Sequence, residues 1–259
     1  MSINVNELIL DRVRSLRLTD LEDGSVLARL TKLEDPSLQT SAESEDVTDA
    51  MGSLITRLFR AKTGKFSATN SLFSVDLYAL QLGTEKEVAD DTNKITTPVE
   101  EILTVEGGKV TLSHTPSNTI KYIYGFERNQ LATKYTVAEA ASETEFMIND
   151  KEITVPTNVT GKIYVEYEYE ATQAVRVRNN SEQFPEAVGV KIDAIFRDQC
   201  NENIKYAGTI VAVKGKIDPS QIEIALTSTG KHAVDIDFFK DYCDESSDLF
   251  SLIIIGDED

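Results

Sequence analysis

Few residues in this sequence have the types and spacing that chemistry requires, and a Gly-Lys pair is the first candidate. Gly64-Lys65 lies in the stretch "AKTGKFSA" and invites a phosphate-loop interpretation. That loop needs the spacing G-x-x-x-x-G-K-[ST]. Phe59 occupies the position of the first glycine, and Phe66 occupies the position of the hydroxyl that would bind magnesium. Gly-Lys pairs also recur beside other alternating apolar runs, so turn chemistry explains them and a nucleotide site is not predicted.

A second candidate is the acidic group near the end of the chain. Asp235 and Asp237 lie on one face of a predicted strand, where two carboxylates could do acid–base work or bind calcium. They lack the glycine and distal glutamate of a calcium loop, and Val234, Ile236 and Phe238 take the opposite face. The alternation predicts a solvent-facing acidic face, which we extend to Asp241 and Asp244. A hydrolase or sugar-binding β-sandwich that uses Asp235, Asp237 and Asp241 is one functional hypothesis, and it is weaker than the two structural hypotheses given below.

The remaining reactive side chains are isolated in the sequence. His114 and His232 are the only histidines, and Cys200 and Cys243 are the only cysteines. None has zinc-ligand spacing, and no nucleophile-elbow motif occurs. We therefore predict no catalytic residue, no metal site and no cofactor, and we do not expect an enzyme.

The composition points to an acidic, well-packed protein. The chain has 259 residues, 41% of them hydrophobic, and a net charge of −18. Such a surface repels phosphate, so a nucleic-acid grip is not expected, although nucleic acid could slide past it. The N-terminus does not have the pattern of a signal peptide, and no apolar run reaches membrane-spanning length, so we expect no membrane contact.

Hydrophobic periodicity predicts the elements of the first part of the chain. Residues 1–22 could form a short helix, and residues 25–33 alternate as a strand. Residues 34–53 show no periodicity and are expected to form a long acidic loop, which carries Glu34, Asp35, Glu43, Glu45, Asp46 and Asp49. Residues 54–69 should form one or two strands, and an amphipathic helix should run from about Asn70 to Gly83 with Phe73, Leu77 and Leu80 packed on a sheet.

The rest of the chain reads as strands. Short strand patterns with regular turn signals between residues 96 and 177 predict a small, Ig-like β module. Residues 187–198, 205–217, 221–229 and 231–239 follow as four strands, with a last strand at 249–255. We therefore divide the chain into one β domain, residues 1–95 and 178–259, and an inserted module, residues 96–177.

The stretches "KTGKFSATNSLF" and "GKIDPSQIEIALTSTGKHAVDIDF", with the order of elements around them, resemble the major tail tube proteins of tailed bacteriophages. The resemblance covers residues 25–90 and 185–259. It implies a mainly β fold, a barrel-like sandwich of two antiparallel sheets flanked by one α-helix. It also implies a virion structural protein, made in the host cytoplasm, whose subunits close into rings, usually of six, that stack into a tube.

In that family a loop between early strands reaches neighbouring subunits, which makes the six acidic residues of the loop at 34–53 candidates for inter-subunit contact. The inner wall is often acidic in that family, so that DNA passes without specific binding. The other partners implied are tail proteins such as the sheath, the terminator or the tape measure. The inserted module keeps a second hypothesis open, namely a decoration, capsid or baseplate subunit.

Overall fold

The computed structural model describes residues 7–201, 203–224, 231–242 and 247–256. The chain divides into two compact units. Unit 1 combines Met1–Lys86 with Val177–Asp259, and unit 2 is Glu87–Arg176. The protein is mainly β, with one α-helix among the described residues.

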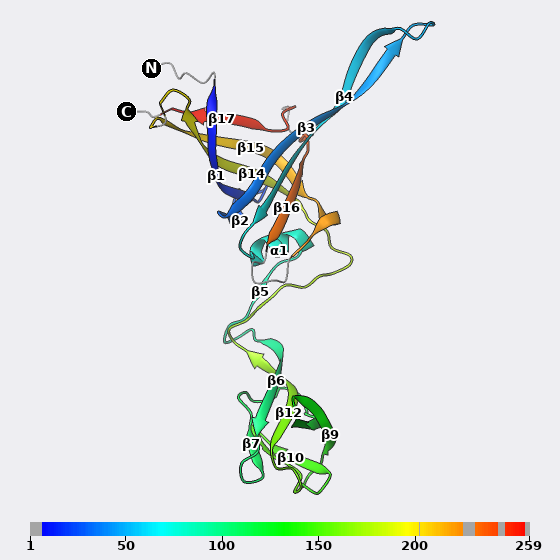
Figure 1. Ribbon diagram of the computed structural model, residues 1–259, viewed down its shortest axis with the longest axis vertical. Coiled ribbons are helices and arrows are strands. Elements are labelled where there is room, and N and C mark those ends of the chain that lie inside the picture. The colour runs from blue at the N-terminus through cyan, green and yellow to red at the C-terminus, as the bar shows by residue number, and fades with distance from the viewer. Residues whose placement is uncertain (1–6, 202, 225–230, 243–246, 257–259) are drawn as a thin grey trace. The chain divides into compact units, whose positions relative to one another are not determined.

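Unit 1 is built on one curved, eight-stranded antiparallel sheet (Figure 1). Its path is β2-β1-β14-β15-β16-β4-β3, and β17 pairs with β15 off this path. The strands are β1 (Leu8–Thr19), β2 (Val26–Leu30), β3 (Leu33–Thr48), β4 (Leu54–Asn70), β14 (Ala187–Asp198), β15 (Lys205–Ile217), β16 (His232–Phe238) and β17 (Ser251–Ile255). The predicted strand at 221–229 is wrong at its start, because Pro219–Gln221 forms a 3-10 turn, and residues 225–230 lie outside the described part.

The two ends of this sheet curve around one core, which makes the unit barrel-like and confirms the predicted fold class. The core draws inward-facing residues from β1, β2, β4, β14, β15 and β16, among them Leu16, Leu30, Phe66, Ile192 and Ile236, all nearly inaccessible to solvent. Alternation along β-strands is the cause, because successive side chains point to opposite faces.

The helix α1 (Val75–Leu82) is shorter than predicted. Ser74 caps its start by accepting a hydrogen bond from the Leu77 amide at 3.2 Å, and Gly83 ends it with a left-handed φ of 66°. Leu77 is fully buried and Leu80 packs against the same core. Phe73 was expected on the apolar face of the helix, but it precedes the helix and is 52% exposed.

A buried histidine attaches the helix to the sheet. The ring of His232 stacks on Phe73, and its Nε2 lies 2.6 Å from Gln81 Oε1. Gln81 also donates to the carbonyl of Ala233 at 2.8 Å. Because Gln81 uses its amide nitrogen there, its oxygen accepts from His232, and Nδ1 is left to accept from the Ser74 amide. Burial lowers the pKa of His232, which keeps the ring neutral in this role.

The predicted helix at residues 1–22 is wrong over the described residues, because Leu8–Thr19 is strand β1. Its pairing with β14 shifts register between Leu10 and Arg12 and again between Val13 and Ser15. These bulges interrupt strict alternation, so the inward residues Val13 and Leu16 are three positions apart, as they would be on a helix face.

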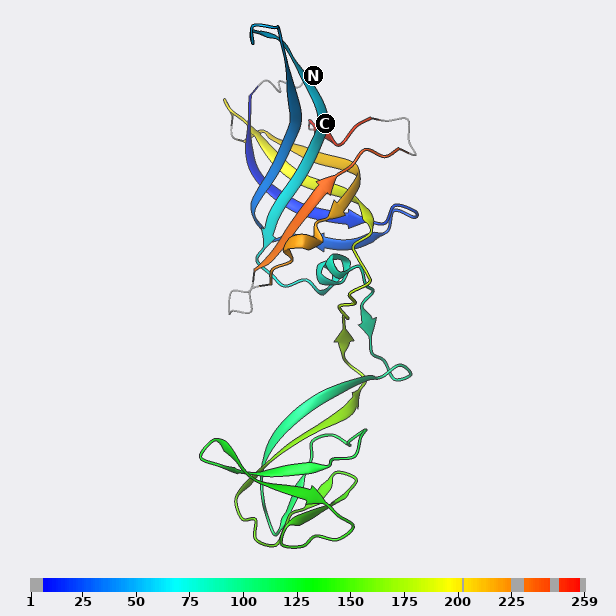
Figure 2. The same cartoon turned by 90° about the vertical axis from the view of Figure 1, so that its right-hand side faces the viewer.

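The predicted acidic loop at residues 34–53 is also wrong, because it forms most of β3 and the turn of a long hairpin. β3 and β4 pair from Leu33↔Asn70 to Thr48↔Leu54, with register shifts near Asp35 and near Ala61. Both of these residues have positive φ, 47° in each case, as bulges often require. Figures 1 and 2 show the tip of this hairpin running beyond the rest of unit 1.

Unit 2 has its own core and its own seven-stranded sheet. The order is β6 (Ile95–Thr104), β12 (Lys162–Ala171), β8 (Tyr122–Glu127), β9 (Gln130–Val137), β10 (Glu145–Asn149), β11 (Glu152–Thr154) and β7 (Lys109–Thr111). Ile123, Phe146, Ile163 and Val165 are fully buried in it. A short pair, β5 (Glu87–Val88) with β13 (Val175–Arg176), joins the two ends of the unit, and the Ig-like topology stays a prediction.

Gly83 offers a sharp test of how α1 is fixed. A Cβ here would lie 2.2 Å from the Phe184 carbonyl oxygen, whereas Gly24, with a similar φ of 72°, has open space. We expect Gly24→Ala to lower the free energy of unfolding by roughly 1 kcal/mol, the cost of the left-handed backbone alone. Gly83→Ala should cost clearly more, measured by urea unfolding of both variants. Equal losses would contradict the close approach of the 184 segment.

Candidate functional site

The part of the β3–β4 hairpin from Ser41 to Thr63, here called the arm, pairs only with itself among the described residues. β16 pairs with β4 only from Gly64 to Asn70, so in the arm both outer strand edges are open. At about 3.4 Å per residue, the arm extends for roughly 30 Å. An isolated two-stranded hairpin is marginal in water, so the arm needs a partner surface.

The arm also exposes large apolar side chains. Met51 is 92% exposed, Phe59 is 69% exposed and Ile55 is 64% exposed. Leu54, Leu58 and Val47 add to the same segment. Exposed apolar groups at this density mark an interaction surface.

Charge in the hairpin is separated by strand. From Leu33 to Ser53 there are six acidic residues and no basic one, whereas β4 carries Arg57, Arg60, Lys62 and Lys65 and no acidic residue. Arg57 pairs with Asp46, 2.5 Å from Nε to Oδ1, and Arg60 pairs with Glu45 at 3.1 Å. The hydrogen bond from Arg57 lowers the pKa of Asp46. The arm therefore has one acidic edge and one basic edge.

The six predicted inter-subunit residues lie at two different places on this hairpin. Glu43, Glu45 and Asp46 lie on the arm, and the Asp49 carboxylate accepts backbone hydrogen bonds in its turn. Glu34 and Asp35 lie instead at the body end of β3. The Glu34 carboxylate is bound within its own chain by Lys231 and Ser71, at 2.6 Å each, and these contacts lower its pKa.

The structure places Asp235 and Asp237 together on the face of β16 that points away from the core. Lysines interleave with them there, since Asp237 lies opposite both Lys65 and Lys216, and Lys65 Nζ is 3.3 Å from Asp235 Oδ2. Asp241 follows β16 and lies 3.4 Å from Lys214 Nζ. Asp244 lies outside the described residues. Lysines thus offset part of the acidic charge of this surface, where Lys65 Nζ also lies 3.8 Å from Asp218 Oδ2, and whether the surface lines a lumen stays a prediction.

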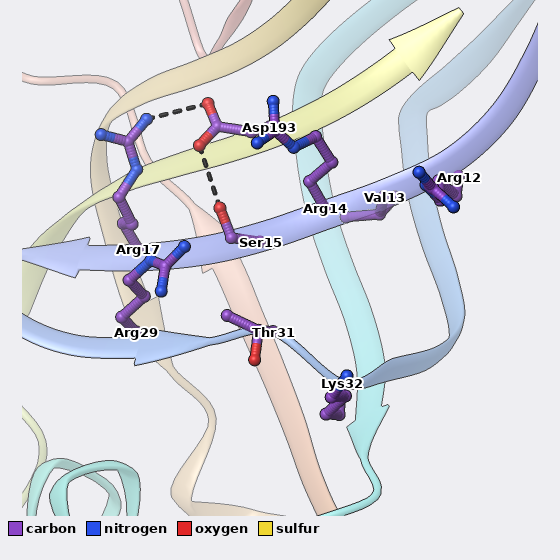
Figure 3. A pocket seen from close by; sticks show the side chains of 9 residues that line it. All are labelled: Arg12, Val13, Arg14, Ser15, Arg17, Arg29, Thr31, Lys32 and Asp193. Atoms are coloured by element: carbon purple, nitrogen blue, oxygen red, sulfur yellow. Dashed lines mark hydrogen bonds and ion pairs between the residues drawn. The ribbon is translucent and has the colours of Figure 1, made fainter.

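A cationic groove was missed by sequence reasoning. It has a volume of about 550 Å³ and is lined by β1, β2 and the link to β3 (Figure 3). Its cations are Arg12, Arg14, Arg17, Arg29 and Lys32. Arg17 lies directly opposite Arg29 on one side and Lys191 on the other, so three like charges adjoin across three strands. Like charges in such positions are destabilising, which indicates that the groove suits an anion.

Asp193 is the carboxylate within the groove. It accepts hydrogen bonds from Arg17 at 2.8 Å, from Ser15 at 3.0 Å and from Thr209 at 3.1 Å. Burial opposes its ionisation, but the three hydrogen bonds outweigh burial and lower the pKa of Asp193. Arg17 Nε is buried and has no hydrogen-bond partner among the described residues. The arginines in "LILDRVRSLRLT" were the sequence signal for this groove. The predicted helix hid that signal, because a helix would have placed these arginines on different faces.

Reactive groups are not gathered elsewhere in the described part of the chain. No three His, Cys, Asp or Glu side chains are placed there to hold a metal ion. His232 is occupied by helix attachment, and His114 stacks on Tyr169. No helix in the described ranges is long and apolar enough to cross a membrane.

The described part of the chain thus combines a barrel-like β unit with a long hairpin arm. Residues 8–251 match the family model of the YomU/Tube protein family, and the chain belongs to this family. Membership indicates a tube-like structural protein of a phage tail, and it favours a non-enzymatic role. No curated protein matches the chain.

The Asp193 cluster predicts a pH-dependent contribution to stability. A carboxylate with a lowered pKa in the folded state stabilises the fold above its ordinary pKa and loses that contribution as pH falls. We expect Asp193→Asn to lower the free energy of unfolding by roughly 1–2 kcal/mol at pH 7, because it weakens hydrogen bonds to Arg17 and Ser15. The difference from the parent protein should shrink below about pH 4.

Urea unfolding at several pH values measures this effect. Asp237→Asn is the control, because that carboxylate lies on β16 and is not a hydrogen-bond partner of Arg17, Ser15 or Thr209. A loss that is the same at pH 3 and pH 7 would show that the charge of Asp193 does not matter.

Proposed function

We propose that this chain is the subunit of a phage tail tube, in which copies close into rings and the rings stack into a conduit for genome DNA. The observation that carries this proposal is the arm, which exposes apolar side chains and two strand edges that the described part of the chain leaves unpaired. Family membership supports the same role.

A ring is the arrangement that fits a barrel with open edges. Open edges invite further strands, and only closure limits that growth. Heterologous contacts that close generate rings, and axial contacts can then stack them. A ring of six follows from the resemblance, as do contacts with the sheath, the terminator or the tape measure.

Passage of DNA requires a wall that does not hold phosphate. The net charge of −18 supports this role, because each cation facing a phosphate releases counterions and adds affinity. The cationic groove must then face a protein neighbour rather than the lumen. The proposed conduit therefore constrains the orientation of the subunit.

Unit 2 supports the second hypothesis, a decoration, capsid or baseplate subunit. It has its own core and its ends meet in the β5–β13 pair, where Arg176 Nε is 3.0 Å from Glu87 Oε2. In this second hypothesis the chain is such a subunit, and unit 2 is its functional module.

Self-assembly through the arm is tested by changing its apolar surface. In the variant Leu54→Ser, Ile55→Ser and Phe59→Ser, we expect a folded protein that no longer forms rings or tubes, because the apolar contact area is lost. Sedimentation and negative-stain electron microscopy of concentrated protein measure this. Ile102→Ser with Leu131→Ser removes comparably exposed apolar groups from unit 2 and should assemble normally. Compact particles from the parent protein at every concentration would contradict the proposed function.

A further inference from the structure

The separation of charge in the arm has a geometric consequence for assembly. The β3 edge bears Glu43, Glu45 and Asp46, and the β4 edge bears Arg57, Arg60 and Lys62. Within the described ranges, each strand of the arm uses only its inner edge, for the other strand of the hairpin. Every copy of the chain therefore carries both an acidic open edge and a basic open edge.

These two edges match each other in direction. β3 and β4 run antiparallel within one hairpin. If two arms lie side by side and point the same way, β3 of one copy runs opposite to β4 of the next. The new pair is then antiparallel too, and the backbone ladder continues across the boundary at the usual strand spacing of about 4.8 Å.

We propose that the arms of adjacent copies join edge to edge, the acidic β3 edge of one copy pairing with the basic β4 edge of the next. The pairing rests on the proposed function, because it specifies which contact joins subunits in a ring. It is heterologous, so each copy donates one edge and accepts another, and a closed ring leaves no arm edge open. Backbone hydrogen bonds supply the contact, and the opposite charges fix which edge meets which.

A second copy fits these edges better than the other possible occupants. A nucleic acid would be attracted to the β4 edge but repelled by the β3 edge beside it and by the net charge of −18. The cationic groove is a competing receptor for the β3 carboxylates, since it carries five cations. It would leave the basic β4 edge and its backbone groups unpaired, which edge-to-edge joining does not.

Charge reversal on one edge at a time tests the pairing. The first variant, Glu43→Lys, Glu45→Lys and Asp46→Lys, has two basic edges. The second, Arg57→Glu, Arg60→Glu and Lys62→Glu, has two acidic edges. We expect each variant alone to lose rings and tubes by about tenfold or more at near-physiological salt, because like charges would face each other at every joint.

The mixture of the two variants is the decisive measurement. An equimolar mixture should recover assembly, with the two variants alternating, because each joint again brings opposite charges together. A chain with all six substitutions should assemble alone. The intra-hairpin pairs Asp46–Arg57 and Glu45–Arg60 are disrupted in both separate variants, so recovery in the mixture cannot come from repair within one hairpin.

Three results would overturn the pairing. Assembly of the second variant by itself would show that the basic β4 edge is not needed and that the carboxylates dock in the cationic groove. Failure of the mixture, with assembly of the six-substitution chain, would show that these charges act only within one hairpin. Absence of assembly in the parent protein would reject the proposed function and the pairing with it, whereas an assembling parent isolates the test of the pairing.

Discussion

The hydrogen-bonding requirement of strand edges governs this structure. A backbone group inside the sheet has its hydrogen-bond partner, whereas an open edge presents unpaired N–H and C=O groups that can bind another strand. In unit 1 the sheet curves so that its two ends enclose one core, and most of its backbone is satisfied there. The β3–β4 hairpin extends past that core, so in the described part of the chain its far half has only one paired edge on each strand.

The sequence of the hairpin follows from this position. Along the body part of β4, Phe66 and Ala68 alternate into the core, as in any half-buried strand. Before Gly64, in the arm, the same strand has no core to face. Apolar residues such as Leu58 and Phe59 appear there on both faces of the strand, together with cations. A surface that served solubility alone would carry neither the apolar groups nor the sorting of charges by strand.

Sequence reasoning succeeded where burial imposes a pattern. The alternation around Ile236 and the helix end at Gly83 could be predicted, because a core face and a left-handed cap leave clear signals. β3 could not be recognised, since its arm faces no core and its residues then have no apolar periodicity. The prediction for β1 was wrong for a different reason. Bulges near Arg12 and Ser15 changed the spacing of its inward-facing residues to one that a helix would also show. The cationic groove could not be predicted while β1 was taken for a helix, because its cations come together only when β1 pairs with β2.

The distribution of charge, rather than its sum, decides what an acidic structural protein can do. The net charge of −18 predicts repulsion of DNA, yet five cations gather in one groove, and lysines neutralise the two aspartates of β16. Coulomb interactions between exposed groups fade beyond about 8–10 Å at physiological salt, so each neighbour responds to a local patch. In the tube that we propose, a subunit meets neighbours at close range on several sides and DNA on one. An overall acidic chain then repels DNA from the proposed lumen, while its basic β4 edge and its groove are free to face acidic protein surfaces.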